Sequence, residues 1–176
     1  GTEMAPATGA MEAMPGMDHG AGMSGHDMTP VPSAGVPDAT ASAGAQPLAF
    51  TMDGDVKVFE LTAQPVRWPL LDGVVATAWT YNGSVPGPMI RVTEGDKVRV
   101  VFKNELPEPT TIHWHGVSVP NNMDGVPGMT QEAVAPGESF TYEFTAQPAG
   151  TYWYHSHVNS DKQIGLGLYA PLIIDP

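Results

Sequence analysis

Apolar and polar residues alternate with a period of two in several short stretches between residues 50 and 176. In one of them Val98, Val100 and Phe102 fall on the side of the chain opposite Arg99. This period places successive side chains on opposite faces of a β-strand. Further strands are expected in the stretches DVKVFELTAQ, VVATAWTYNG, MIRVTEGDKVRVVFKNEL (two strands around EGD), ESFTYEFTA and GLGLYAPLIIDP.

Turn signals separate these stretches, among them Asn82-Gly83 and the prolines of SVPGPM. No segment shows a convincing 3.6-residue period. Many short strands divided by turns are typical of an antiparallel sandwich or barrel. The pattern therefore predicts one all-β domain, at residues 51–176.

Residues 1–50 have a different character. They are rich in Ala, Gly, Pro, Ser and Thr and contain no Lys, Arg, Trp or Tyr. Such a segment buries too little apolar surface to offset its chain entropy, so we expect a disordered N-terminal tail. Its thioethers and imidazoles suit copper capture, although a flexible leader without a role would have the same composition. The residues concerned are Met4, Met11, Met14, Met17, Met23, Met28, His19 and His26.

The net charge of −12 argues against a nucleic-acid or anionic-membrane partner, because both require a basic patch. The chain has no cysteine, which excludes disulfides, zinc-thiolate sites, a cysteine nucleophile and a complete blue-copper site. No stretch reaches the length of a transmembrane segment. The chain starts at Gly1, and we expect that a leader preceding it has been removed.

Two stretches, TIHWHGVSV and TYWYHSHV, each carry a pair of histidines one residue apart. On a strand such residues share a face, so His113 projects with His115 and His155 with His157. Burying imidazoles costs solvation energy unless partners are supplied, and a metal ion satisfies several rings at once. We therefore predict a metal site; the alternative is four hydrogen-bonded structural histidines.

The spacing and the donor atoms limit what this site holds. Imidazoles at positions i and i+2 start about 6.5–7 Å apart along a strand, so a pair serves either one ion or two neighbouring ions. An all-nitrogen donor set favours copper or zinc over calcium or magnesium.

IHWHG followed by YWYHSHV resembles the first two copper-ligand motifs of the multicopper oxidases, the laccase and cuprous-oxidase family. YNGSVPGPMIRVTEGDKVRV and MDGVPGMTQEAVAPGESFTYEF extend the likeness over most of residues 50–176. The resemblance implies the N-terminal domain of such an enzyme, a Greek-key cupredoxin-like (plastocyanin-like) β-sandwich. It also implies that the cofactor is copper.

The same resemblance implies roles for individual residues. His113 matches a ligand of the type 2 copper, and His115, His155 and His157 match ligands of the type 3 pair. Asp124, in NNMDGVPG, matches a carboxylate near the type 2 copper that orients water and passes protons; the alternative is that Asp124-Gly125 is only a turn pair.

The trinuclear copper cluster of the family has further ligands, in a His-x-x-His-x-His stretch and a His-Cys-His stretch, and neither occurs here. The implied function is that of one domain of an oxidase that reduces dioxygen to water. Its partners would be further cupredoxin domains of the same oxidase, dioxygen and a reducing substrate, either a phenol or a metal ion.

By itself this chain would be inactive as an enzyme. Export, to the periplasm or the cell exterior, is expected from the resemblance. Two alternatives are a standalone copper-binding or copper-delivery protein and a structural sandwich with vestigial histidines.

Overall fold

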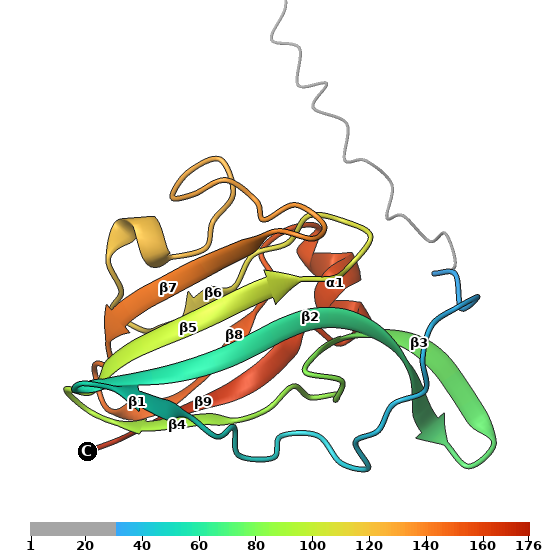
Figure 1. Cartoon of the computed structure of the whole chain (residues 1–176), viewed down its shortest axis with the longest axis horizontal. Coiled ribbons are helices and arrows are strands. Elements are labelled where there is room, and N and C mark those ends of the chain that lie inside the picture. Colours follow the sequence, from blue (N-terminus) through green and yellow to red (C-terminus); the bar gives the residue numbers. More distant parts are fainter. Residues whose placement is uncertain (1–30) are drawn as a thin grey trace, which may run out of the picture.

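The computed structural model describes residues 31–176, which form two β-sheets packed face to face (Figure 1). In these residues the first sheet contains β1 (Thr51–Asp53), β2 (Val56–Leu71), β3 (Val74–Tyr81), β5 (Lys97–Asn104) and β7 (Ser139–Thr145). The second contains β4 (Ile90–Thr93), β6 (His113–His115), β8 (Gly150–His155) and β9 (Tyr169–Asp175). The predicted β-sandwich is confirmed.

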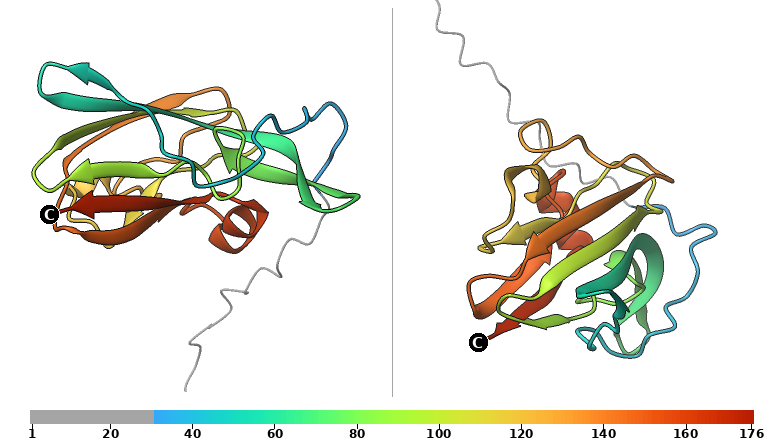
Figure 2. Two further views of the ribbon diagram at one scale, coloured as in Figure 1. Left: turned by 90° about the horizontal axis from the view of Figure 1, so that it is seen from below. Right: turned by 60° about the vertical axis from the view of Figure 1, so that its left-hand side comes forward.

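The strand pairing differs from a purely antiparallel sandwich. β2 pairs in parallel with β5, and β4 in parallel with β9; the remaining strand pairs are antiparallel. The two strands predicted around Glu94-Gly95-Asp96, β4 and β5, lie in different layers (Figure 2). Because the chain crosses between sheets at this turn, each strand pairs with a distant strand of its own sheet. Alternation predicts the faces of a strand but not its neighbours.

The core between the sheets follows the predicted alternation. Val98, Val100 and Phe102 of β5 are all buried. Across the core the indole ring of Trp114, from the second sheet, lies 4.9 Å from the ring of Phe144 in the first. Aromatic pairs at this spacing add to the free energy gained by burial, so they fix how the sheets pack.

Two short helical segments interrupt the strands. A 3-10 turn, η1 (Asn121–Met123), follows β6, and α1 (Ser160–Leu166) lies between β8 and β9. The sequence analysis missed α1 because seven residues are too few to show a helical period. Among residues 31–176, no helix is long and apolar enough to cross a membrane.

Residues 31–50 differ from the predicted disordered tail, because they run along the sandwich. The backbone N–H of Ala39 donates to the carbonyl oxygen of Arg67 at 3.0 Å, and that of Leu48 to Met89 at 2.8 Å. Val31 and Leu48 also pack against the core. The segment needs no core of its own, because backbone groups of the sandwich are its partners. The methionine- and histidine-rich stretch lies outside the described residues.

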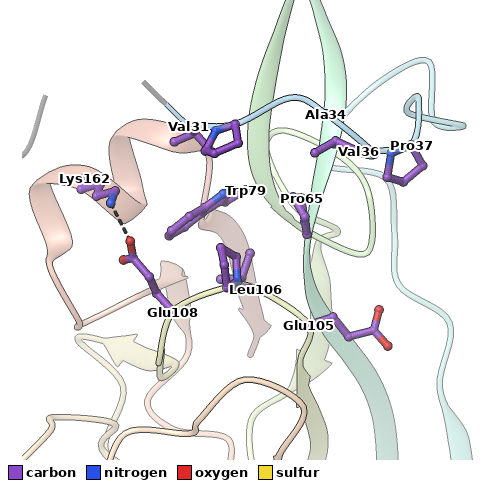
Figure 3. A pocket seen from close by; sticks show the side chains of 13 residues that line it. Val31, Ala34, Val36, Pro37, Pro65, Trp79, Glu105, Leu106, Glu108 and Lys162 are labelled. Carbon is purple, nitrogen blue, oxygen red and sulfur yellow. Dashed lines mark hydrogen bonds and ion pairs between the residues drawn. The ribbon is translucent and has the colours of Figure 1, made fainter. Parts of the chain in front are cut away.

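Residues 31–37 close over a cavity of about 660 Å³ (Figure 3). Its other walls are Pro65, Trp79, the loop 105–108 and Lys162. Lys162 of α1 and Glu108 of the loop form an ion pair of 2.6 Å at its side.

The turn between the two sheets depends on Asp96. Its carboxylate accepts a hydrogen bond from the backbone N–H of Thr93 at 2.7 Å and another from Nζ of Lys57 at 2.5 Å. Partial burial acts to raise the pKa of Asp96, but the hydrogen bonds from Lys57 and Thr93 outweigh it. The pKa of Asp96 is therefore lower than its ordinary value.

We predict that Asp96→Asn lowers the free energy of unfolding by about 1 kcal/mol at neutral pH. A carboxyl group with a depressed pKa contributes stability above its unfolded-state pKa of about 4, and the contribution disappears as the pH falls through the folded-state value. Urea unfolding at a series of pH values measures this difference, which should shrink in acid. Asp55→Asn, which breaks an exposed pair with Lys97, should have a smaller effect at neutral pH. A deficit for Asp96→Asn that persists undiminished in strong acid would contradict this role.

Candidate metal centre

The two histidine stretches lie side by side as neighbouring antiparallel strands. In the register of β6 and β8, His113 pairs with His155, Trp114 with Tyr154, and His115 with Trp153. Trp114 and Tyr154 point into the core and are fully buried. Because side chains alternate along a strand, the histidines of both strands are forced onto the outer face of the second sheet.

The four imidazoles gather into one cluster. The ring centroid of His113 lies 5.6 Å from that of His115, 5.3 Å from that of His155 and 5.2 Å from that of His157. His113, His115 and His155 each offer a nitrogen within 4.8 Å of the others. His157 follows the end of β8 and adjoins this set without belonging to it. The four predicted residues are thus brought together, and three of them have ring nitrogens within 4.8 Å of one another.

Hydrogen bonds fix which nitrogen of two rings faces the cluster. Nδ1 of His113 lies 2.7 Å from the carbonyl oxygen of Asp124, and Nδ1 of His155 lies 2.8 Å from that of Ser156. A carbonyl oxygen can only accept, so each Nδ1 carries a proton. In the neutral rings Nε2 then carries no proton and keeps its lone pair, the arrangement that suits metal binding.

Nδ1 of His115 lies 3.1 Å from Nε2 of His155. Because the proton of the neutral His155 ring is on Nδ1, the proton between the two rings belongs to His115. Nδ1 of His115 can become a ligand atom only if this proton moves, and the ring can take it up on Nε2 instead.

The surroundings of His155 favour its uncharged ring. Burial lowers the pKa of His155, and the neighbouring rings lower it further, although the hydrogen bond to the Ser156 carbonyl acts in the opposite direction. His155 is therefore neutral at pH 7, and neutral imidazole is the form that binds metal ions.

Asp124 lies beside His113, as the sequence suggested. Its Oδ1 is 3.4 Å from Nδ1 of His113, while its backbone carbonyl makes the shorter contact described above. The contact depends on Gly125, which has a φ of +75° and approaches the Ile112 carbonyl so closely that a Cβ would overlap the oxygen. Asp124-Gly125 is therefore more than a surface turn, because it brings a carbonyl to the first histidine.

Trp153 also lies at the cluster and is not among the residues predicted from the sequence. Its ring lies 4.1 Å from that of His155 and 5.2 Å from that of His115, and the residue is 37% exposed. The indole therefore covers one side of the cluster. The alternation that placed His155 also places Trp153 on the same face, and this signal could have identified it.

The sequence model of the multicopper oxidase family matches residues 62–176. The chain belongs to the multicopper oxidase family. A multicopper oxidase of Mycobacterium tuberculosis, MmcO, is 40% identical over 143 residues, covering 81% of this chain and 28% of that protein. Copper resistance protein A of Pseudomonas syringae is 40% identical over 134 residues, covering 76% and 21%.

Solved structures of multicopper oxidases share the fold of this domain. That of a multi-copper oxidase from Pseudomonas thermotolerans has a TM-score of 0.68 at 47% identity, over 70% of this chain and 30% of that one. The blue copper oxidase of Nitrosomonas europaea has a TM-score of 0.66 at 43% identity, over 68% and 38%. The cupredoxin-like fold is thereby confirmed. This multicopper oxidase domain spans less than a third of the length of either sequence relative above.

The contact between Gly125 and Ile112 can be tested by comparing two glycines of one loop. Gly125→Ala should lower the free energy of unfolding by about 2 kcal/mol more than Gly128→Ala, which costs about 1 kcal/mol. Both residues have positive φ, but a Cβ at Gly128 meets open space. Denaturant unfolding gives the energies, and NMR signals of the His113 ring should shift in Gly125→Ala alone. Equal losses of stability would show that the close approach is unimportant.

Proposed function

We propose that this domain supplies four histidines to a copper cluster at which a multicopper oxidase reduces dioxygen to water. The gathering of four imidazoles on the outer face of β6 and β8 is the observation that carries the proposal. As the resemblance implies, His113 would be the ligand of the type 2 copper. His115, His155 and His157 would belong to the type 3 pair.

The residues present fit copper. The donor atoms are imidazole nitrogens without a carboxylate in the set, and such donors suit copper in either oxidation state. In His113 and His155 the Nδ1–H group donates to a backbone carbonyl oxygen. Nε2 is then the ligand atom, as expected of metal-binding histidines. Bound copper would supply the one-electron steps by which dioxygen is reduced.

The cluster would form one wall of a metal site, because it is not enclosed by the described residues. His115 and His157 are exposed and His113 is half-buried, whereas His155 is buried. A polynuclear site open to water on this side needs further ligands, which another cupredoxin domain of the same oxidase would provide. That domain would also hold the type 1 copper, because this chain has no cysteine.

The carboxylate of Asp124 would transfer protons beside the histidine cluster. It lies 3.4 Å from the ring nitrogen of His113 and is one-third exposed, so it can exchange protons with water. In the oxidase it would orient water and deliver protons. The reducing substrate would be a phenol or a metal ion, and the place of action the periplasm or the cell exterior.

Copper titration of the 176-residue chain tests this function. We expect Cu(II) to bind weakly, with nitrogen couplings in its electron paramagnetic resonance spectrum and without intense blue absorption. His113→Ala and His155→Ala should weaken binding by about tenfold or more. His19→Ala combined with His26→Ala is the control, because it tests the N-terminal stretch and should leave this signal unchanged.

Other outcomes would contradict parts of the proposal. Tight, stoichiometric binding by the isolated chain would favour a copper carrier over an oxidase domain. Binding that survives the cluster variants but is lost in the control would move the copper site to the N-terminal stretch.

A further inference from the structure

A buried amide lies behind the histidine cluster. Gln163 is the buried residue of α1 and is fully shielded from solvent. Its Oε1 accepts hydrogen bonds from Oγ1 of Thr110 at 2.8 Å and from Oγ of Ser156 at 2.5 Å. Its Nε2 donates to the carbonyl oxygen of Pro109 at 3.0 Å. One side chain therefore joins three separate segments of the chain.

Two of these segments carry the histidines. Ser156 stands between His155 and His157, and its carbonyl oxygen accepts the hydrogen bond from Nδ1–H of His155. Pro109 and Thr110 begin the segment that leads into β6 and His113. The amide thus bridges the approach to one histidine pair and the middle of the other.

The pairing of β6 with β8, which holds the two histidine pairs together, is short. β6 has three residues, and its ladder with β8 ends at the pairing of His113 with His155. Beyond that point the two segments leave the sheet. Thr110, Ser156 and Gln163 are all buried there, and a buried polar network that is fully hydrogen-bonded specifies one arrangement.

We propose that Gln163 is a positioning residue, which sets the separation of the two histidine pairs and thereby the copper affinity of the cluster. This role rests on the proposed function. Gln163 acts through Ser156, whose hydroxyl it holds and whose carbonyl orients His155. It contacts neither the copper ions nor dioxygen.

The adjacent residue offers a matched control. Lys162 joins α1 to the same loop through its ion pair with Glu108 (Figure 3). This contact faces the cavity beneath residues 31–37 and involves neither Thr110 nor Ser156. Lys162→Gln therefore removes a link between the helix and the loop while leaving the polar network intact.

The experiment compares Gln163→Leu, Ser156→Ala, the double variant and Lys162→Gln in the 176-residue chain. The Cu(II) dissociation constant is measured by titration, and the ¹⁵N NMR signals of the His155 ring report its tautomer in the metal-free protein. Gln163→Leu should weaken copper binding by about tenfold and give His155 a mixture of tautomers. Lys162→Gln should change neither quantity.

The double variant tests whether the amide acts through the serine. If it does, Gln163→Leu adds little to the effect of Ser156→Ala on copper affinity, whereas independent effects would multiply. If Gln163→Leu does not fold, Ser156→Ala must still shift the His155 tautomer and weaken copper binding.

Different results would overturn the positioning role of Gln163 and the proposed copper site. If the wild-type chain binds copper at the histidines but Gln163→Leu changes neither the copper affinity nor the His155 tautomer, the positioning role alone is overturned. Equal losses in Gln163→Leu and Lys162→Gln also overturn it, because they indicate a general loosening of α1. A wild-type chain that binds no copper at these histidines overturns the proposed function and this role together.

Discussion

The anchoring of Trp114 and Tyr154 in the core is the constraint on which the rest of this structure depends. These residues face each other across β6 and β8, and their rings lie 5.6 Å apart between the two sheets. A one-residue slip of either strand would place an indole or a phenol in water and a histidine in the core. The burial of these large rings therefore holds the imidazoles outside, in one register.

In this register the histidines contact other protein groups on one side and face solvent on the other. Backbone carbonyls of Asp124 and Ser156 hold the rings of His113 and His155, and the Trp153 ring packs beside that of His155. On the solvent side His115 and His157 are exposed. This asymmetry suits the proposed half of a shared metal site, in which the ligand positions would be fixed before a second domain covers them.

The sequence predicted the parts of this structure that follow from local alternation. The strand faces, the core positions of β5, and the pairing of histidines within each stretch all follow from the period of two. The parallel pairings did not follow, because nothing in a strand pattern identifies a distant neighbour. The ordered path of residues 31–50 was missed for a related reason, since its partners are backbone groups of the sandwich rather than its own apolar residues.

The residues of the candidate site likewise divide into those that the sequence identified and those that only the structure reveals. His113, His115, His155 and His157 were found because identical motifs recur, and Asp124 because of the family resemblance. Gln163 gave no signal, since a single polar residue in a seven-residue helix looks like any exposed one. Its burial and its hydrogen bonds to two distant segments appear only in three dimensions.

The central claim is that these imidazoles form a copper site. X-ray diffraction from copper-soaked crystals, recorded above and below the copper absorption edge, tests it most directly. The account predicts anomalous peaks about 2 Å from the ring nitrogens of His113, His115 and His155. Copper absent from this face, or found only near the N-terminal methionines, would contradict it.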